Sequence, residues 1–299
     1  MFQNHRLHVY EWRPQEEIKA VLYLVHGVLE HLGRYDNLVN ELNNSGILVR
    51  GLDLVGHGYS EGDRGHIDSI ESYITDVVSH LLDTRNEYSS LPLFLMGHSM
   101  GGLIAIATAL QQQDVLSGLI LSAPGIEVDP QVAGPVSKLA VKALGFLFPQ
   151  VGVKRFDTDV ISSVPEEVEA YVNDPLIYHG ALKAGWSSAM FKSIEMYRPQ
   201  INEINIPLLI MHGTGDSLVP FSASQFVNDN ASSSDKTFES FQGSHHEILH
   251  DREQDRARQL IVDWILARLN GPVLSTPEVQ PESDLVEDVP SIEVTNEQQ

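Results

Sequence analysis

The sequence predicts an α/β fold with a mostly parallel central sheet, helices on both faces of that sheet and an inserted helical cap. Short apolar runs alternate with segments of helical spacing, as in βαβ units whose helices cover both faces of a sheet. This alternation stops between about residues 125 and 199, where prolines, glycines and amphipathic stretches predict a helical insertion. With 299 residues, 42% of them hydrophobic, the chain can form one α/β domain of about 200–250 residues plus that insertion.

The expected strands are apolar runs, and the expected helices carry apolar residues at helical spacing. The apolar runs are 20–25, 47–52, 93–96, 119–121 and 208–211, and the helices are 35–44, 69–88, 100–112 and 254–269. One more strand, 236–241, is expected just before a loop that contains two histidines. Asn44-Ser45-Gly46 supplies the glycine with which the first helix should end. A weak alternation over His5–Trp12 predicts an antiparallel edge strand.

We divide the chain accordingly. Residues 1–124 and 200–270 are the two parts of the core, residues 125–199 the helical cap, and residues 271–299 an acidic disordered tail. The insertion contains two segments rich in aromatic and aliphatic side chains, 144–149 and 186–191. They either form a lid over an apolar site or only pack the insertion onto the core.

The formal net charge is -22, of which the seven acidic residues after Gly271 contribute -7. The remaining -15 argues against a nucleic-acid partner and against electrostatic adhesion to anionic membranes. The sequence has no cysteine, so disulfides, thiolate metal sites and a cysteine nucleophile are excluded. The first eight residues lack the apolar core of a secretory signal, and no apolar run approaches the ~18 residues of a membrane span. We expect a cytoplasmic protein, or one peripheral to a membrane.

The most informative motif is Gly97-His98-Ser99-Met100-Gly101, which lies between an apolar run and an apolar helical segment. Glycines on both sides of Ser99 permit a sharp strand-to-helix turn, and such a turn can hold a serine hydroxyl clear of its neighbours. Ser99 is therefore the candidate nucleophile.

A serine nucleophile needs a base to take its proton and a carboxylate to orient that base. Asp216 follows the run 208–211 in a tight loop and is the candidate acid; Asp229 and Asp235 lie in a polar run that a solvated loop explains better. Two adjacent histidines follow residues 236–241, and we favour His246 over His245 because Glu247-Ile248-Leu249 is expected to begin the next helix.

The segment His246-Glu247-Ile248-Leu249-His250 also matches the H-E-x-x-H zinc motif. A zinc site would place both histidines on one face of a helix with a third ligand elsewhere, but it would leave Ser99 and Asp216 unexplained. We therefore predict no metal and no organic cofactor.

Ester hydrolysis also needs donors for the developing oxyanion, and backbone amides commonly supply them. We assign these donors to the N–H groups of Met100, which follows the nucleophile, and Val28, in the loop that begins His26-Gly27.

Taken with residues 26–35 and 53–62, these motifs resemble those of the monoacylglycerol lipase family of α/β-hydrolases, over nearly the whole ordered chain. Asn173-Asp174-Pro175-Leu176 resembles that family's cap region. The resemblance implies the triad Ser99, Asp216 and His246, and an oxyanion hole formed by the amides of Val28 and Met100. It also implies a lid over a lipophilic tunnel, with the glycerol head near Glu30, Arg34 and Tyr171; Glu30 and Arg34 could equally form a structural ion pair.

The predicted function is hydrolysis of a monoacylglycerol to fatty acid and glycerol through an acyl-serine intermediate. The substrate partner is a lipid ester, and we expect transient contact of the cap with a membrane surface. A lysophospholipase or general carboxylesterase with the same triad is the alternative. A catalytically silent hydrolase-like binding protein, with the acidic tail as its docking element, is the alternative from another class.

Overall fold

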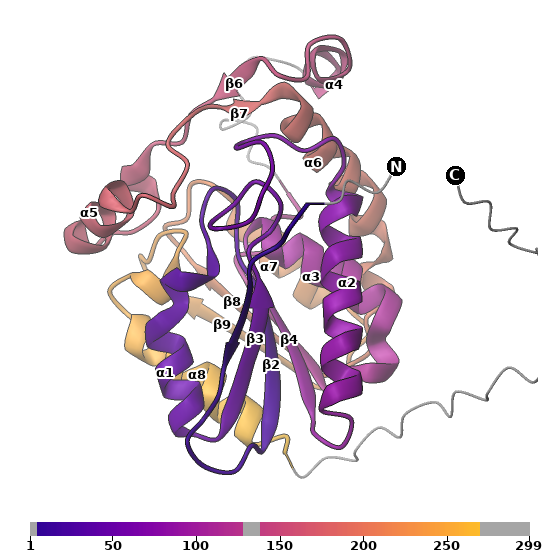
Figure 1. Cartoon of the computed structure of the whole chain (residues 1–299), viewed down its shortest axis with the longest axis vertical. Coiled ribbons are helices and arrows are strands. Elements are labelled where there is room, and N and C mark those ends of the chain that lie inside the picture. The colour runs from indigo at the N-terminus through magenta and orange to yellow at the C-terminus, as the bar shows by residue number, and fades with distance from the viewer. Residues whose placement is uncertain (1–4, 128–137, 270–299) are drawn as a thin grey trace, which may run out of the picture.

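The computed structural model describes residues 5–127 and 138–269 and shows the α/β-hydrolase fold (Figure 1). Seven strands form one sheet in the order β1-β3-β2-β4-β5-β8-β9. Their bounds are β1 Val9–Trp12, β2 Ala20–Val25, β3 Ile47–Leu52, β4 Leu93–His98, β5 Gly118–Ser122, β8 Leu208–Gly213 and β9 Lys236–Phe241. Only the pairing of β1 with β3 is antiparallel in this sheet, so β1 is the predicted edge strand.

Strand β2 shows why the central strands are apolar throughout. Its residues Val21, Tyr23 and Val25 belong to the hydrophobic cluster on one face of the sheet, and Ala20, Leu22 and Leu24 belong to the cluster on the other. Both faces are therefore buried, and a strand buried on both faces has no polar side to alternate with.

Two layers of helices cover these faces (Figure 1). The first layer comprises α1 (Asp36–Asn44) and α8 (Gln254–Leu266). The second comprises α2 (Ile70–Glu87), α3 (Met100–Gln112) and α7 (Phe221–Asn230), and α6 (Ala184–Tyr197) packs against α2 and α3. The predicted helices of the core are confirmed, and the end of α1 at Asn44 is followed closely by Gly46, whose φ of 84° favours glycine.

One local prediction is wrong. Residues 247–249 do not begin the last long helix: Ile248–His250 form a separate 3₁₀ turn, and α8 begins only at Gln254. The amide of Glu247 donates to the Ile161 carbonyl oxygen at 2.8 Å, and its φ and ψ of -93° and 73° are not helical. A tertiary contact therefore replaces the expected helix start.

The described residues between β5 and β8, which we call the insertion (138–203), lie above the carboxyl ends of the strands (Figure 1). They contain α4 (Lys138–Leu147), α5 (Pro165–Asn173), α6 and a small antiparallel pair, β6 (Gly152–Lys154) with β7 (Leu182–Lys183). The division into core and cap domains stays a prediction, and the predicted tail, 271–299, falls outside the described residues.

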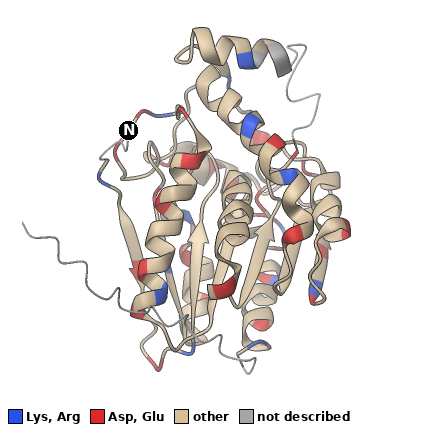
Figure 2. Ribbon diagram, turned by 90° about the vertical axis from the view of Figure 1, so that its right-hand side faces the viewer, with Lys and Arg blue, Asp and Glu red and all other residues tan. Residues whose placement is uncertain are grey.

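Charged residues occur mainly in the helices and loops (Figure 2), and acidic ones outnumber basic ones, 41 to 19 over the whole chain. Among the described residues, no helix combines the length and apolar character needed to cross a bilayer.

The close approach of α3 to β2 gives a testable prediction. A Cβ atom at Gly101 would lie 2.3 Å from the Val25 carbonyl oxygen and 2.4 Å from that of His26. Because neither backbone oxygen can move freely, Gly101→Ala should lower the free energy of unfolding by about 1–3 kcal/mol. Urea denaturation should show a lower midpoint with an unchanged slope; a midpoint equal to that of the wild type would contradict this packing.

Candidate active site

Ser99 occupies a strained turn between β4 and α3. Its φ and ψ are 55° and -120°, a combination that L-residues rarely adopt. The backbone is held in place by its hydrogen bonds: the Ser99 amide donates to the Ser122 carbonyl, and the Ser99 carbonyl accepts from the amides of Gly102 and Gly125, at 2.8–2.9 Å. Strain of this kind persists only where surrounding contacts enforce it.

The structure brings together the three residues that the sequence singles out. The Ser99 Oγ lies 2.8 Å from the His246 Nε2, and the His246 Nδ1 lies 2.6 Å from the Asp216 Oδ2. Ser99 follows β4, Asp216 follows β8 and His246 follows β9, so all three stand at the carboxyl edge of the sheet. Their arrangement allows the imidazole to accept the serine proton while the carboxylate stabilises the resulting charge.

Asp216 is fully buried and well supplied with donors. Its Oδ1 accepts from the amides of Leu218 and Val219 at 2.8 and 3.0 Å, and the His212 Nε2 lies 3.0 Å from its Oδ2. Burial raises the pKa of Asp216, but His246 and His212 outweigh that effect and hold the pKa well below its usual range. Asp216 is therefore ionised at neutral pH.

The surroundings of His246 stabilise its protonated form more than water stabilises that of an exposed histidine. Burial lowers its pKa, but the charge and hydrogen bond of Asp216 outweigh burial, with Glu247 and Glu30 adding to the effect, so the pKa lies above the ordinary 6.5. Nearby His98 behaves oppositely: burial and the neighbouring His246 lower its pKa to about 4. A neutral His98 leaves His246 as the group that can carry the proton.

The competing acids and the competing histidine lie away from Ser99. Asp229 is exposed on α7 rather than in the loop that the sequence suggested, and Asp235 pairs with Arg268 at 2.5 Å. The backbone amide of His245 donates to Asp251, and its buried Nδ1 has no hydrogen-bond partner among the described residues. Of the two histidines, only His246 reaches Ser99.

The geometry does not fit the zinc motif. Both ring nitrogens of His246 are engaged by Ser99 and Asp216, and the His250 Nε2 donates to the Arg34 carbonyl at 2.9 Å. The two histidines do not share a helix face, because only a 3₁₀ turn, Ile248–His250, follows His246. Over residues 5–127 and 138–269, no group of three or more His, Asp or Glu side chains is arranged to hold a metal ion.

The two candidate oxyanion donors border the same cavity as Ser99. Val28 and Met100 both line it, and neither backbone amide finds an acceptor elsewhere in the described part of the protein. The Val28 loop packs closely against the serine, since a Cβ at Gly27 would lie 3.3 Å from the Ser99 Cβ. Within the described residues, both amides are therefore without an acceptor at the wall of the cavity that Ser99 also lines.

Glu30 and Arg34 form an ion pair at 2.8 Å, which was one of the two interpretations of these residues from the sequence. Arg34 also makes a bidentate ion pair with Glu247, at 2.6 and 2.9 Å. Glu30 and Tyr171 line the cavity, whereas Arg34 does not; its guanidinium lies 4.8 Å from the centre of the Tyr171 ring. Of the three proposed head-group contacts, two thus face the cavity and Arg34 lies behind them.

The cavity has a volume of about 290 Å³ and a lining of mixed chemistry. Three of its lining residues, Glu30, Glu247 and Tyr171, gather around the Arg34 guanidinium, and we call this part of the cavity its polar end. Apolar side chains of the insertion line much of the rest: Leu144, Val153, Phe156, Trp186, Met190 and Phe191. The 186–191 segment thus faces the site, whereas Phe146, Leu147 and Phe148 of the 144–149 segment are exposed.

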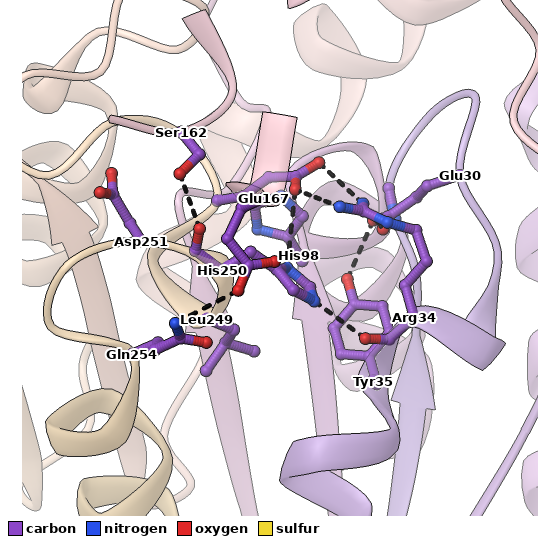
Figure 3. Close-up of polar contacts among 12 residues, drawn as sticks. Glu30, Arg34, Tyr35, His98, Ser162, Glu167, Leu249, His250, Asp251 and Gln254 are labelled. Carbon is purple, nitrogen blue, oxygen red and sulfur yellow. Dashed lines mark hydrogen bonds and ion pairs between the residues drawn. The ribbon is translucent and has the colours of Figure 1, made fainter. Parts of the chain in front are cut away.

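The contacts of three polar residues near the site were not predicted from the sequence. His212 contacts Asp216, and Glu247 pairs with Arg34. His250 binds the Arg34 backbone (Figure 3). His212 lies near the end of β8 and precedes Asp216 by four residues, which is the one local signal that could have identified it. The contacts of Glu247 and His250 span more than 200 residues and leave no local pattern.

Comparison with known proteins agrees with this architecture. The family model described as serine aminopeptidase, S33, matches residues 16–253. The chain is 34% identical to monoglyceride lipase of Rattus norvegicus over 80% of its own length and 78% of the relative's. It is 32% identical to phospholipase YtpA of Bacillus subtilis over 83% of its own length and 95% of the relative's.

Among solved structures, the chain is similar to the monoacylglycerol lipase of Paleococcus ferrophilus, with a TM-score of 0.80 and 29% identity, covering 88% of this chain and 99% of the other. These matches identify a serine hydrolase of the lipase and esterase type. The chain belongs to the α/β-hydrolase family and is a monoacylglycerol lipase-like carboxylic ester hydrolase within it.

Proposed function

We propose that this protein hydrolyses monoacylglycerols to a fatty acid and glycerol. The observation that carries the proposal is the hydrogen-bonded series Ser99–His246–Asp216 at a cavity that is apolar over most of its wall and polar at one end. An acyl chain fits the apolar part, and an alcohol head fits the polar end. We also propose that residues 125–199 act as the cap that supplies the apolar wall.

The reaction follows from the positions of these groups. His246 takes the proton of Ser99 as the serine oxygen attacks the ester carbonyl, and the amides of Val28 and Met100 bind the oxyanion. His246 then protonates the leaving alcohol, forming an acyl-serine, and afterwards activates a water that releases the fatty acid. No step requires a cofactor.

The charge at the polar end favours glycerol over a phosphate-bearing head group. Glu30 and Glu247 border this end, and the guanidinium of Arg34 is already bound by both carboxylates. Two carboxylates against one guanidinium leave a negative charge, which repels an anionic phosphate but can accept hydrogen bonds from hydroxyl groups. This observation ranks a lysophospholipase below a monoacylglycerol lipase.

Two measurements test the catalytic proposal. Replacing Ser99 by Ala should lower kcat on a monoacylglycerol at least about 10³-fold while leaving the unfolding midpoint near that of the wild type. Wild-type enzyme should hydrolyse a monoacylglycerol faster than a lysophospholipid of the same acyl chain. A folded Ser99→Ala variant with full activity would disprove the mechanism, and a preference for the lysophospholipid would disprove the head-group assignment.

The pH dependence follows from the raised pKa of His246. The base must be neutral to accept a proton, so kcat/KM should rise with pH as His246 loses its proton. Because that pKa lies above 6.5, the acidic limb of a kcat/KM profile should have its midpoint above pH 6.5. A midpoint near pH 4 would instead indicate control by a carboxyl group.

We further propose that the insertion contacts a lipid surface to collect its substrate. Phe146, Leu147 and Phe148, at the end of α4, are 85%, 63% and 59% exposed, and Leu144 of the same helix lines the cavity. An exposed apolar helix end beside an apolar cavity can enter the boundary of a bilayer.

The double variant Phe146→Ser/Phe148→Ser should therefore bind phosphatidylcholine vesicles more weakly in a sedimentation assay. It should also hydrolyse vesicle-borne monoacylglycerol more slowly, with unchanged kcat on a water-soluble ester. Val9→Ser, which removes another exposed apolar side chain (54% exposed) from edge strand β1, is the matched control. Equal losses in both variants would contradict a specific contact.

A further inference from the structure

A cluster of three buried charged side chains lies beside the candidate active site. Glu30, Arg34 and Glu247 have side chains only 3%, 8% and 7% exposed. Glu247 binds both terminal nitrogens of Arg34, at 2.9 and 2.6 Å, and Glu30 binds one of them at 2.8 Å. Burying three charges is costly in free energy, so a stability role alone is a weak explanation for such a cluster.

The cluster joins the loop that contains Val28, a candidate oxyanion donor, to the loop that contains His246, the candidate base. The Glu30 Oε1 accepts from the Gly27 amide at 2.6 Å and from the Tyr35 hydroxyl at 2.9 Å, which fixes the backbone immediately before Val28. Figure 3 shows the Arg34 and Tyr35 side chains directed toward Glu30. At the other side, Glu247 directly follows His246 in the chain.

Two backbone contacts strengthen this connection. The His250 Nε2 donates to the Arg34 carbonyl at 2.9 Å (Figure 3), so the histidine loop holds Arg34 by its backbone as well as by its guanidinium. The Glu247 amide donates to the carbonyl of Ile161, which lines the cavity. Segments near residues 30, 161 and 247 therefore meet at Glu247.

We propose that Glu247 is a positioning residue for ester hydrolysis: through Arg34 and Glu30 it fixes the oxyanion loop relative to His246. The inference rests on the proposed function, because it assigns Glu247 a role in the same reaction. Catalysis depends on the distance between the base and the oxyanion donors, and a displacement of about 1 Å can cost about 10²-fold in rate.

The same carboxylate acts on His246 by its charge. Three sets of titratable or charged groups surround His246. They are its partner Asp216 with His212 behind it, the charged cluster Glu30, Arg34 and Glu247, and the neighbouring rings of His98, Tyr171 and His250. Replacing Glu247 by Gln removes one negative charge and leaves Arg34 balanced by Glu30. The imidazolium of His246 then loses stabilisation, and its pKa falls.

The test compares Glu247→Gln with the wild type on p-nitrophenyl butyrate, an ester without a glycerol head. We expect kcat to fall about tenfold or more with KM within about twofold, since the interaction matters in the transition state. We also expect the acidic limb of kcat/KM to move to lower pH. A purely structural role would not shift that limb.

Glu41→Gln is the matched control. It removes a carboxylate from the ion pair between Glu41 and Arg258, which likewise joins the first and last parts of the chain but lies on α1 and α8. This variant should keep the wild-type kcat and pH profile. Arg34→Lys retains the charge but loses the bidentate contact with Glu247, so it should show the same fall in kcat. It serves as the second test of the inference if Glu247→Gln does not fold.

If Glu247→Gln and Arg34→Lys both fold and keep the wild-type kcat and pH profile, the inference is overturned. An inactive Ser99→Ala would still leave the proposed function standing in that case. Full activity of Ser99→Ala would instead overturn the proposed function. If Glu247→Gln raised KM for monoacylglycerol and left kcat on p-nitrophenyl butyrate unchanged, Glu247 would be a head-group contact and not a positioning residue.

Discussion

The candidate site depends on one backbone turn, at Ser99. The turn directs the serine hydroxyl away from the sheet, and it exists because α3 approaches β2 more closely than any side chain at position 101 would permit. Backbone hydrogen bonds from Ser99 to Ser122, and from Gly102 and Gly125 to Ser99, stabilise the strained conformation. A rigid turn removes the need to order the serine during the reaction, which lowers the entropic part of the barrier.

The second requirement is a base that is poised to take up a proton in a buried setting. Burial alone would lower the pKa of His246, as it does for His98 and His57. Asp216 reverses this effect because it is ionised and in direct contact, and its own charge is held by two amides and by His212. The difference between His246 and His98 thus lies in a single carboxylate partner and not in the degree of burial.

Much of this could be predicted from the sequence because the key residues follow strands of one parallel sheet. Ser99 and Asp216 come after apolar runs and His246 after the expected strand 236–241, and the carboxyl ends of β4, β8 and β9 reach the same edge. The runs of β4 and β8 are unambiguous because these strands are buried on both faces, whereas β9 is partly exposed and carries a mixed pattern. The last loop was predicted less well: a contact of Glu247 with Ile161, made by the tertiary fold, replaced the local helix signal.

The charged cluster shows what local patterns cannot reveal. Arg34 and Glu247 are 213 residues apart in the sequence. Arginine and glutamate are usually exposed to solvent, so nothing in the sequence indicates that these two are buried together. Their contact depends on two loops whose courses are set by the whole sheet, since one loop follows β2 and the other β9. Because β2 and β9 are not neighbours in the sheet, no strand pairing fixes the distance between these loops. The buried ion pair between Arg34 and Glu247 links the two loops directly. The distance between the oxyanion loop and the base therefore depends on side-chain charges as well as on the sheet.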